Sequence, residues 1–160
     1  MPSLLAFDPL TPHELSFVLD TARALLLSAA AGDARALLRG RQFGLLCESE
    51  SDGAAALFRQ AATALGAQVT HIRPSLMALA TPNEIQRTAQ MLGRLYDAVA
   101  CEGVLPALAL AMAGAGVPVY DGLASAQHAT ARLAALLAGE ASAADKRRVI
   151  LQALLLSSVA

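Results

Sequence analysis

Four short apolar runs, separated by longer segments of helical periodicity, constrain the fold of this chain most strongly. The runs cover residues 43–47, 68–72, 97–101 and 117–120. Successive runs begin roughly 20–30 residues apart with a helical segment between them, which is typical of right-handed β-α-β units. Both faces of each run are apolar, as in the strands of a buried parallel sheet. We therefore expect an α/β fold, a three-layer α/β/α sandwich around a four-stranded parallel sheet.

Two segments carry the same signal for the start of a helix. Thr11-Pro12-His13-Glu14 and Thr81-Pro82-Asn83-Glu84 each combine a capping threonine, a proline in the first helical position and a glutamate three residues after the threonine. This combination predicts a capping box. Ser142, followed by Asp145, predicts the start of a last helix that runs to about residue 158. Further helices are expected over residues 53–65, 105–113 and 127–138.

Composition limits the classes of function. The chain has 160 residues, of which 56% are apolar and 16% charged, and its net charge is −1. This length suits one domain with a real core. Because no basic cluster exists and aromatic residues make up only 4%, nucleic-acid binding is not expected. The mean hydropathy of +0.50 suggests that a partner covers part of the surface.

Targeting signals and cysteine usage point to a cytoplasmic protein. The first residues lack the basic start and the apolar length of a signal peptide. The longest uncharged run, residues 103–120, is interrupted by glycines and prolines, so no membrane span is expected. Two cysteines, Cys47 and Cys101, make no disulfide framework and fit a reducing compartment.

An acidic stretch follows the first predicted strand. Glu48, Glu50 and Asp52 lie at a strand-to-helix turn, with no lysine or arginine between them and Arg59. In an α/β sheet the ligand crevice lies beyond the carboxyl ends of the strands, and such turns usually hold a phosphate or carboxylate. These acidic residues could bind a cation or an amine. They could equally cap the helix that follows, with no ligand at all.

Three stretches resemble a known family. They are residues 65–70 (Leu-Gly-Ala-Gln-Val-Thr), 88–98 (Thr-Ala-Gln-Met-Leu-Gly-Arg-Leu-Tyr-Asp-Ala) and 116–123 (Gly-Val-Pro-Val-Tyr-Asp-Gly-Leu). Together they resemble the carbamoyl-phosphate-binding domain of the transcarbamoylases, and the ornithine enzyme more than the aspartate enzyme. The resemblance covers about residues 5–138.

The resemblance implies where a ligand would bind, and there the sequence departs from the family. The family's phosphate loop reads Ser-Thr-Arg-Thr-Arg, but here Ser51-Asp52-Gly53-Ala54-Ala55 stands in its place, with Phe58 keeping the register. A further phosphate-binding arginine corresponds to Glu102. The His-Pro-x-Gln motif keeps its histidine, His128, and loses its proline and glutamine, and the loop lysine near Thr81 is absent. The family-equivalent positions are therefore Ser51, Asp52, Gly53, Ala54, Glu102 and His128.

These replacements predict a loss of activity. Carbamoyl phosphate carries about two negative charges, which the family neutralises with arginines. Loss of one charged partner costs roughly 2–5 kcal/mol, and here three arginines are replaced and two carboxylates are gained. The resemblance thus implies a carbamoyltransferase-like protein without catalytic residues, and no cofactor is expected.

The end of the chain differs from the family as well. A transcarbamoylase continues into a second domain, whereas here about seven residues (138–144) lead to a segment, from residue 145, that resembles the family's final helix. We expect one domain over residues 1–160, with a family-like core at 5–138, a junction at 139–144 and a closing helix at 145–158. The alternative is that the last segment is simply a new amphipathic helix.

Two residue types leave alternatives open. His128 could be a ligand in the old pocket or a structural histidine at a helix start. Cys47, Cys101 and His128 could together form a metal site, but cysteines at strand ends are more often small buried hydrophobic residues. We therefore expect no metal, with these three residues as the minor alternative.

The predicted helix at residues 105–113 has no charged face. A helix that is apolar all round is usually buried on all sides, so a second chain is expected to cover it, and a monomer with an alanine-rich surface helix is the alternative. The resemblance implies a homo-oligomer, with a trimer preferred, because transcarbamoylases assemble through this domain. Three functions remain open: a non-catalytic assembly or regulatory protein with a protein partner, a module for a small cationic or neutral ligand, and a transferase that borrows residues from a partner chain.

Overall fold

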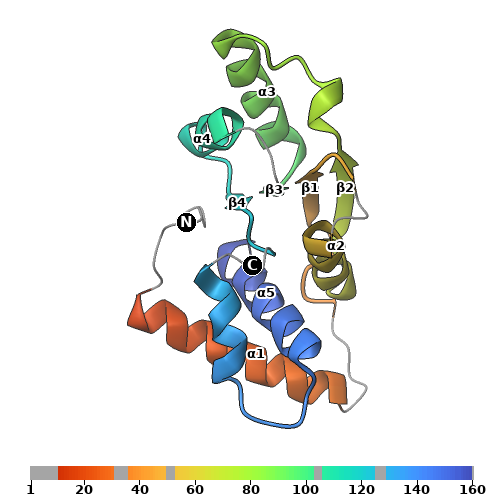
Figure 1. The fold of residues 1–160 in the computed structure, drawn as a ribbon, viewed down its shortest axis with the longest axis vertical. Helices are drawn as coiled ribbons and strands as arrows, with labels where there is room; N and C mark the ends of the chain where they lie inside the picture. The colour runs from red at the N-terminus through yellow and green to blue at the C-terminus, as the bar shows by residue number, and fades with distance from the viewer. Residues whose placement is uncertain (1–10, 31–35, 50–52, 103–105, 125–128, 160) are drawn as a thin grey trace.

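The computed structural model describes residues 11–30, 36–49, 53–102, 106–124 and 129–159 (Figure 1). Its elements follow the alternation that the sequence predicts. In chain order they are α1 (Pro12–Ala30), β1 (Gln42–Leu46), α2 (Gly53–Ala64), β2 (Gln68–Ile72), the 3₁₀ helix η1 (Pro74–Leu76), α3 (Pro82–Leu95), β3 (Ala98–Cys101), α4 (Pro106–Gly114), β4 (Val119–Asp121), the 3₁₀ helix η2 (Ala129–Leu136) and α5 (Ala143–Val159).

The four strands form one parallel sheet in the order β2-β1-β3-β4. Leu46, at the end of β1, pairs with Ile72 of β2 and with Cys101 of β3, and Cys101 pairs with Asp121 of β4. The carboxyl ends of all four strands therefore meet at the same edge of the sheet. This confirms the predicted four-stranded parallel sheet.

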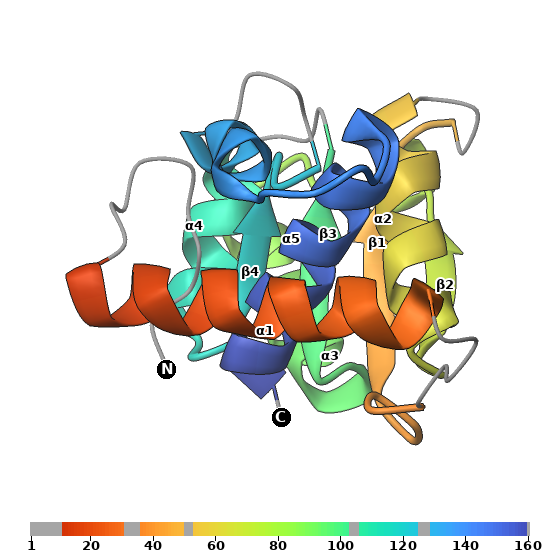
Figure 2. The ribbon, with the colours of Figure 1, turned by 90° about the horizontal axis from the view of Figure 1, so that it is seen from below.

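Helices cover both faces of the sheet and make the three predicted layers. In Figure 1, α3 and α4 lie on one side of the strands, and α1, α2 and α5 lie on the other. The last helix, α5, packs against α1, α2 and η2. Figure 2 shows α1 running across the molecule in front of α5, so this side of the sheet carries a second helical layer.

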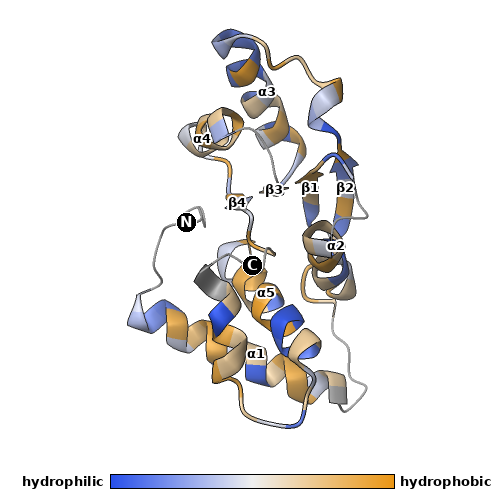
Figure 3. Cartoon of the chain, in the orientation of Figure 1, coloured by the Kyte–Doolittle hydropathy of each residue, from blue (hydrophilic) through white to orange (hydrophobic). Residues whose placement is uncertain are grey.

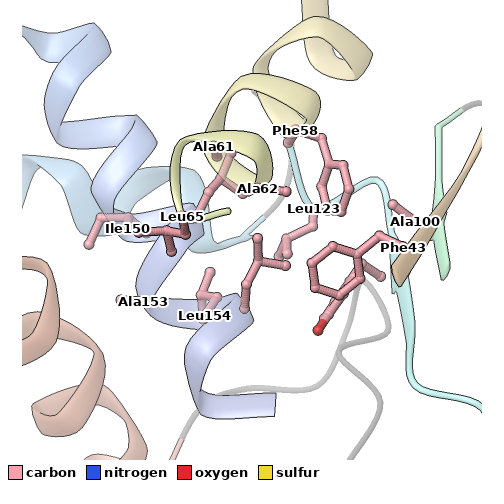
Figure 4. Close-up of a cluster of buried hydrophobic side chains, with 14 of the residues drawn as sticks. Phe43, Phe58, Ala61, Ala62, Leu65, Ala100, Leu123, Ile150, Ala153 and Leu154 are labelled. Carbon is pink, nitrogen blue, oxygen red and sulfur yellow. The ribbon is translucent and has the colours of Figure 1, made fainter. Parts of the chain in front are cut away.

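The larger core lies between the sheet and α1, α2 and α5. Three aromatic side chains, Phe43, Phe58 and Tyr120, pack with ring centroids 6.0–6.4 Å apart. Figure 4 shows Leu123, Leu154 and Ile150 grouped with residues of α2 in this core. The Tyr120 hydroxyl is hydrogen-bonded to that of Ser158, and burial raises the pKa of Tyr120 to about 12. The end of α5 is thereby joined to β4.

The smaller core lies between the sheet and α3 and α4. Its buried members include Leu46, Leu92, Val99, Leu108 and Met112. At Gly93 a side chain is excluded, because a Cβ there would lie 2.6 Å from Cγ2 of Val117. Glycine therefore lets α3 approach the segment before β4 closely.

The predicted helix caps form as the sequence indicates. Thr81 makes a complete capping box with Glu84, and Thr11 and Glu14 exchange the same two hydrogen bonds at the start of α1. At the start of α5, the Ser142 hydroxyl accepts a hydrogen bond from the Asp145 N–H at 3.1 Å. Among the described helices, none combines the length and the apolar character needed to cross a membrane.

Two elements differ from their prediction. The strand expected from residue 117 begins at Val119, because the Val117 N–H bonds back to Met112 O and Gly116 takes a positive φ of 81° to close α4. The helix expected over residues 127–138 is a 3₁₀ helix in its described part, Ala129–Leu136. Apolar residues spaced by three share a face in both helix types, so the spacing alone does not separate them.

Candidate functional site

The carboxyl edge of the sheet is where the fold places a ligand crevice. From this edge the chain continues into Glu48 after β1, Arg73 after β2 and Glu102 after β3. Of the family-equivalent positions, Gly53, Ala54 and Glu102 are described by the structure, whereas Ser51, Asp52 and His128 lie outside the described residues. Glu50 lies outside them too.

Glu102 is the buried acidic residue of this edge. Its backbone N–H donates to Leu46 O at 2.9 Å, which extends the pairing of β3 with β1 by one residue. The residue is only 6% exposed, and its carboxylate accepts a hydrogen bond from the Ala124 N–H at 3.3 Å. A buried carboxylate requires such partners because desolvation strongly disfavours its charge. Glu102 therefore places a buried carboxyl group at this edge of the sheet.

Arg147 brings a positive charge to the segment that follows β4. It lies in the second turn of α5, and its Nη2 donates to Leu123 O at 2.6 Å. Burial lowers the pKa of Arg147, and the Glu102 carboxylate opposes this by attraction. Sequence reasoning placed Arg147 in the closing helix without a role, because nothing in the local sequence indicates that this helix reaches the end of β3.

Glu48 lies at the same edge in a different environment. It is exposed, and its two carboxylate oxygens accept hydrogen bonds from the N–H and the hydroxyl of Ser75, at 2.8 and 2.7 Å. Arg73 Nε lies 3.9 Å from Glu48 Oε2. The Ser75 hydroxyl, then the Ser75 N–H, then Arg73 hold the pKa of Glu48 below its usual value. The hydrogen bonds between Glu48 and Ser75 thus connect η1 to the segment after β1.

The start of α2 has the small residues that the sequence suggested. The helix begins at Gly53, where an added Cβ would meet no atom within 4 Å. Phe58, which corresponds to the phenylalanine of the family's helix, is fully buried in the larger core. No cationic side chain stands in the first turn, because residues 53–56 are glycine and alanines.

The two cysteines pack in different cores. Cys47 belongs to the core under α2 and α5, and Cys101 to the core under α3 and α4, on the other face of the sheet. Both thiols are buried and reduced. In the part of the chain that the structure describes, no group of three potential metal ligands comes together. The structure thus does not bring Cys47 and Cys101 together, and His128 of the same alternative lies outside the described residues.

A depression of about 560 Å³ lies at the other end of the sheet. It is lined by Gln90, Arg94, Tyr96, Asp97 and the segment from Ala115 to Pro118. These residues precede β3 and β4, so this depression is separate from the carboxyl edge. Asp97 is engaged there, since its carboxylate accepts a hydrogen bond from the Gln42 N–H at 2.8 Å.

The sequence over residues 3–140 matches the family described as aspartate/ornithine carbamoyltransferase, carbamoyl-P binding domain. The chain belongs to this family. Ornithine carbamoyltransferase of Haemophilus influenzae is 34% identical over 128 residues, covering 79% of this chain and 38% of that protein. The catabolic ornithine carbamoyltransferase of Pseudomonas putida is 33% identical over 136 residues. The match covers 84% of this chain and 40% of that protein.

Solved structures show the same fold. Ornithine carbamoyltransferase from Pyrococcus furiosus aligns with a TM-score of 0.69 at 22% identity, covering 84% of this chain and 43% of that one. The catalytic subunit of aspartate transcarbamoylase from M. jannaschii aligns with a TM-score of 0.66 at 20% identity. The alignment covers 85% of this chain and 45% of that chain. The chain spans about two fifths of the length of the two curated relatives above. The match to the family model confirms the predicted resemblance to the carbamoyl-phosphate-binding domain.

Proposed function

We propose that this family member does not bind carbamoyl phosphate and acts as a non-catalytic, oligomeric binding or regulatory protein. One observation carries the proposal: the buried carboxylate of Glu102 lies at the carboxyl edge of the sheet, where the resemblance leads one to expect an arginine. A second carboxylate, that of Glu48, lies at the same edge.

Electrostatics explain why this edge is unsuited to a dianion. Two cations reach its described part: Arg73 Nε lies 3.9 Å from Glu48 Oε2, and Arg147 is attracted electrostatically by the Glu102 carboxylate. A bound phosphate would have to compete with these carboxylates for the same guanidinium groups. Since the loss of one charged partner already costs roughly 2–5 kcal/mol, and each 1.4 kcal/mol changes a dissociation constant about tenfold, useful affinity is not expected.

The position of α5 supports a single-domain organisation. All of its residues from Val149 to Leu155 are buried, and it packs against α1, α2 and η2. We propose that residues 145–158 act as a closing helix on the family-like core of residues 5–138, with residues 139–144 as the junction. The whole chain, residues 1–160, then forms one transcarbamoylase-like domain.

Isothermal titration calorimetry tests the loss of ligand binding. Carbamoyl phosphate should give no saturable heat at concentrations up to the millimolar range, while an intact ornithine carbamoyltransferase, titrated in parallel, should bind it. Saturable binding in the micromolar range would overturn the proposal. Carbamoyltransferase activity that arises only when a second chain is added would instead favour the alternative in which a partner completes the site.

The face formed by α3 and α4 supports the oligomer. Figure 3 shows no strongly hydrophilic colour on α4, in contrast to α3. Leu110 of α4 is 65% exposed, and Leu95 and Met91 of α3 are exposed as well. Exposed apolar side chains on a helix without charges suit a protein interface. We therefore place the contact of a homo-oligomer, preferably a trimer, on this face.

Light scattering coupled to size-exclusion chromatography tests the oligomer. The wild type should elute as an oligomer, and Leu110→Glu should shift it toward the monomer because a charge would be buried in the contact. Leu27→Glu is the matched control, since Leu27 is 73% exposed and lies on α1, across the sheet. A wild type that remains monomeric at high concentration would contradict the assembly, as would equal effects of the two variants.

A module for a small cationic or neutral ligand is the second candidate, but the described residues do not favour a cation. Glu48 already accepts hydrogen bonds from Ser75, and Glu102 from Ala124. A thermal-shift screen with amines, amino acids and divalent cations separates the candidates. A stabilising compound would favour the ligand module, whereas capture of a specific protein partner by the purified chain would favour the regulatory protein.

A further inference from the structure

Helix α1 exposes apolar side chains on the side that faces away from the molecule. Its inner side carries Val18 and Ala22, which are buried in the larger core with residues of α5. Figure 2 views α1 from its outer side, where it is the foremost helix. On this outer side Phe17 is 49% exposed and Leu27 is 73% exposed. Two large apolar side chains therefore lie on the surface of α1, one on each side of its middle.

The exposed residues of α1 follow a heptad spacing. Phe17, Asp20, Ala24 and Leu27 are all exposed, and they are separated by three, four and three residues. This is the spacing of the a and d positions along which two helices pack against each other. The set is also symmetric about residue 22, because 17 and 27 are equally far from it, and so are 20 and 24. A second copy of this helix, running antiparallel, would therefore place Phe17 against Leu27 twice.

We propose that this face of α1 is an interface between two copies of the chain, in which the two α1 helices pack antiparallel about a two-fold axis. A two-fold contact uses the same patch on both copies, so the patch must be complementary to itself. The symmetric spacing meets this requirement, which a contact with an unrelated protein would not impose. The interface is a second one, separate from the contact placed on α3 and α4.

The charges of the same face are also self-complementary. Asp20 and Arg23 form an ion pair at 3.1 Å, and their side chains are 71% and 51% exposed. In the antiparallel register Asp20 lies opposite Ala24 of the second copy, and therefore one residue away from the level of its Arg23. Each Asp20 then has a second guanidinium nearby. The two copies together contribute equal numbers of carboxylates and guanidinium groups, so the contact is electrostatically balanced.

The two interfaces can form at the same time, because α1 lies on the opposite side of the sheet from α3 and α4 (Figure 1). Leu27→Glu changes only the α1 interface, so its product should still be held together by α3 and α4. Leu110→Glu should leave the α1 interface intact. The two variants should therefore yield different species, which keeps a failure of this inference distinct from a failure of the oligomer in the proposed function.

Disulfide cross-linking tests the antiparallel register. Phe17→Cys and Leu27→Cys, mixed in equal amounts and oxidised, should form a disulfide-linked pair of chains, whereas the native Cys47 and Cys101 are buried. Each variant alone should form no such pair. Position 17 of one copy would lie ten residues, or about 15 Å, from position 17 of the other, and a disulfide needs Cα atoms within about 7 Å. Phe17→Cys mixed with Leu76→Cys controls for random collisions, since Leu76 is 77% exposed and lies on η1.

A mixture that stays unlinked would overturn the inference, as would equal linking in the single variants or in the control with Leu76→Cys. Light scattering gives a second measurement that needs no disulfide. Phe17→Glu should have at most half the mass of the wild-type assembly, because its charge would lie in the contact, whereas Phe17→Leu should keep the wild-type mass. Equal masses for Phe17→Glu and the wild type would also overturn the inference. None of these outcomes depends on the titration with carbamoyl phosphate.

Discussion

The two faces of the sheet are covered by different numbers of helical layers. On one face, α2 and α5 cover the strands, and α1 lies across α5 as a further layer, around three packed aromatic rings. On the other face, α3 and α4 form a single layer whose outer side exposes Leu110 and Leu95. The difference indicates that stability is concentrated under α5, whereas the α3 and α4 face remains available for contact with another chain.

Phe58→Ala should have the largest effect and tests the deeper face. Phe58 is fully buried, with its ring centroid 6.0 Å from that of Phe43 and 6.2 Å from that of Tyr120. We expect a loss of about 3–5 kcal/mol in the free energy of unfolding, because the cavity would lie between rigid neighbours. Urea denaturation followed by circular dichroism measures it. A loss below about 2 kcal/mol would show that this core is not the dominant one.

Met112→Ala makes the corresponding change on the shallower face. Met112 is fully buried in the core under α4. We expect a loss of about 2–3 kcal/mol, in the lower part of the range for such truncations, because a single helical layer can relax toward the cavity. The same urea denaturation applies. A loss as large as that of Phe58→Ala would remove the proposed asymmetry between the two faces.

Gly93→Ala tests the close approach of α3 to the segment before β4. The added Cβ would lie 2.6 Å from Cγ2 of Val117, so we expect a loss of about 1–3 kcal/mol from overpacking. Gly114→Ala is the control, since a Cβ there would meet no atom within 4 Å. Thermal unfolding of both variants separates the contact from the general effect of replacing glycine in a helix. Equal unfolding midpoints for Gly93→Ala and Gly114→Ala would contradict the close contact at Gly93.

Thr81→Ala removes the cap of α3 without touching either core. The threonine hydroxyl accepts a hydrogen bond from the Glu84 N–H at 3.2 Å. Loss of this bond should lower the free energy of unfolding by about 1 kcal/mol, as measured by urea denaturation. Thr81→Ser keeps the hydroxyl and should retain most of the stability. A serine variant as unstable as the alanine variant would show that the cap is not the cause.

Glu48→Gln should have the smallest effect, and its effect should depend on pH. The pKa of Glu48 is lowered by the hydrogen bonds from Ser75, so its ionised form is favoured in the folded state. The stability that it contributes is present above its ordinary pKa of 4.5 and is lost as the pH falls through the lowered folded value. The difference in stability between wild type and variant should therefore shrink on acidification. A difference independent of pH would contradict this assignment.

Local signals in the sequence predicted most of the fold. The capping boxes at Thr11 and Thr81 depend on residues three apart, and the four strands on short apolar runs, so both can be read along the chain. Where the prediction missed, as at the start of β4, a tertiary turn at Gly116 decided the boundary.

The candidate site was less predictable because its charges come from distant segments. The sequence shows Glu102 but does not show that Arg147, forty-five residues later, contacts Leu123, the residue before the Ala124 whose N–H donates to Glu102. That proximity depends on how α5 docks against α1 and α2, which is a property of the packed core. Likewise, Glu48 meets Ser75 and Arg73 only because β1 and β2 pair in one particular register.

The packing of α1 on α5 has a consequence for synthesis in the cell. Helix α1 emerges from the ribosome before α5, against which it packs and which comprises residues 143–159. The apolar stripe of α1 must therefore wait until residues 143–159 are translated, because domains fold as units and non-local contacts form late. During that interval the apolar side of α1, with Val18 and Ala22, does not yet have the helix that it packs against.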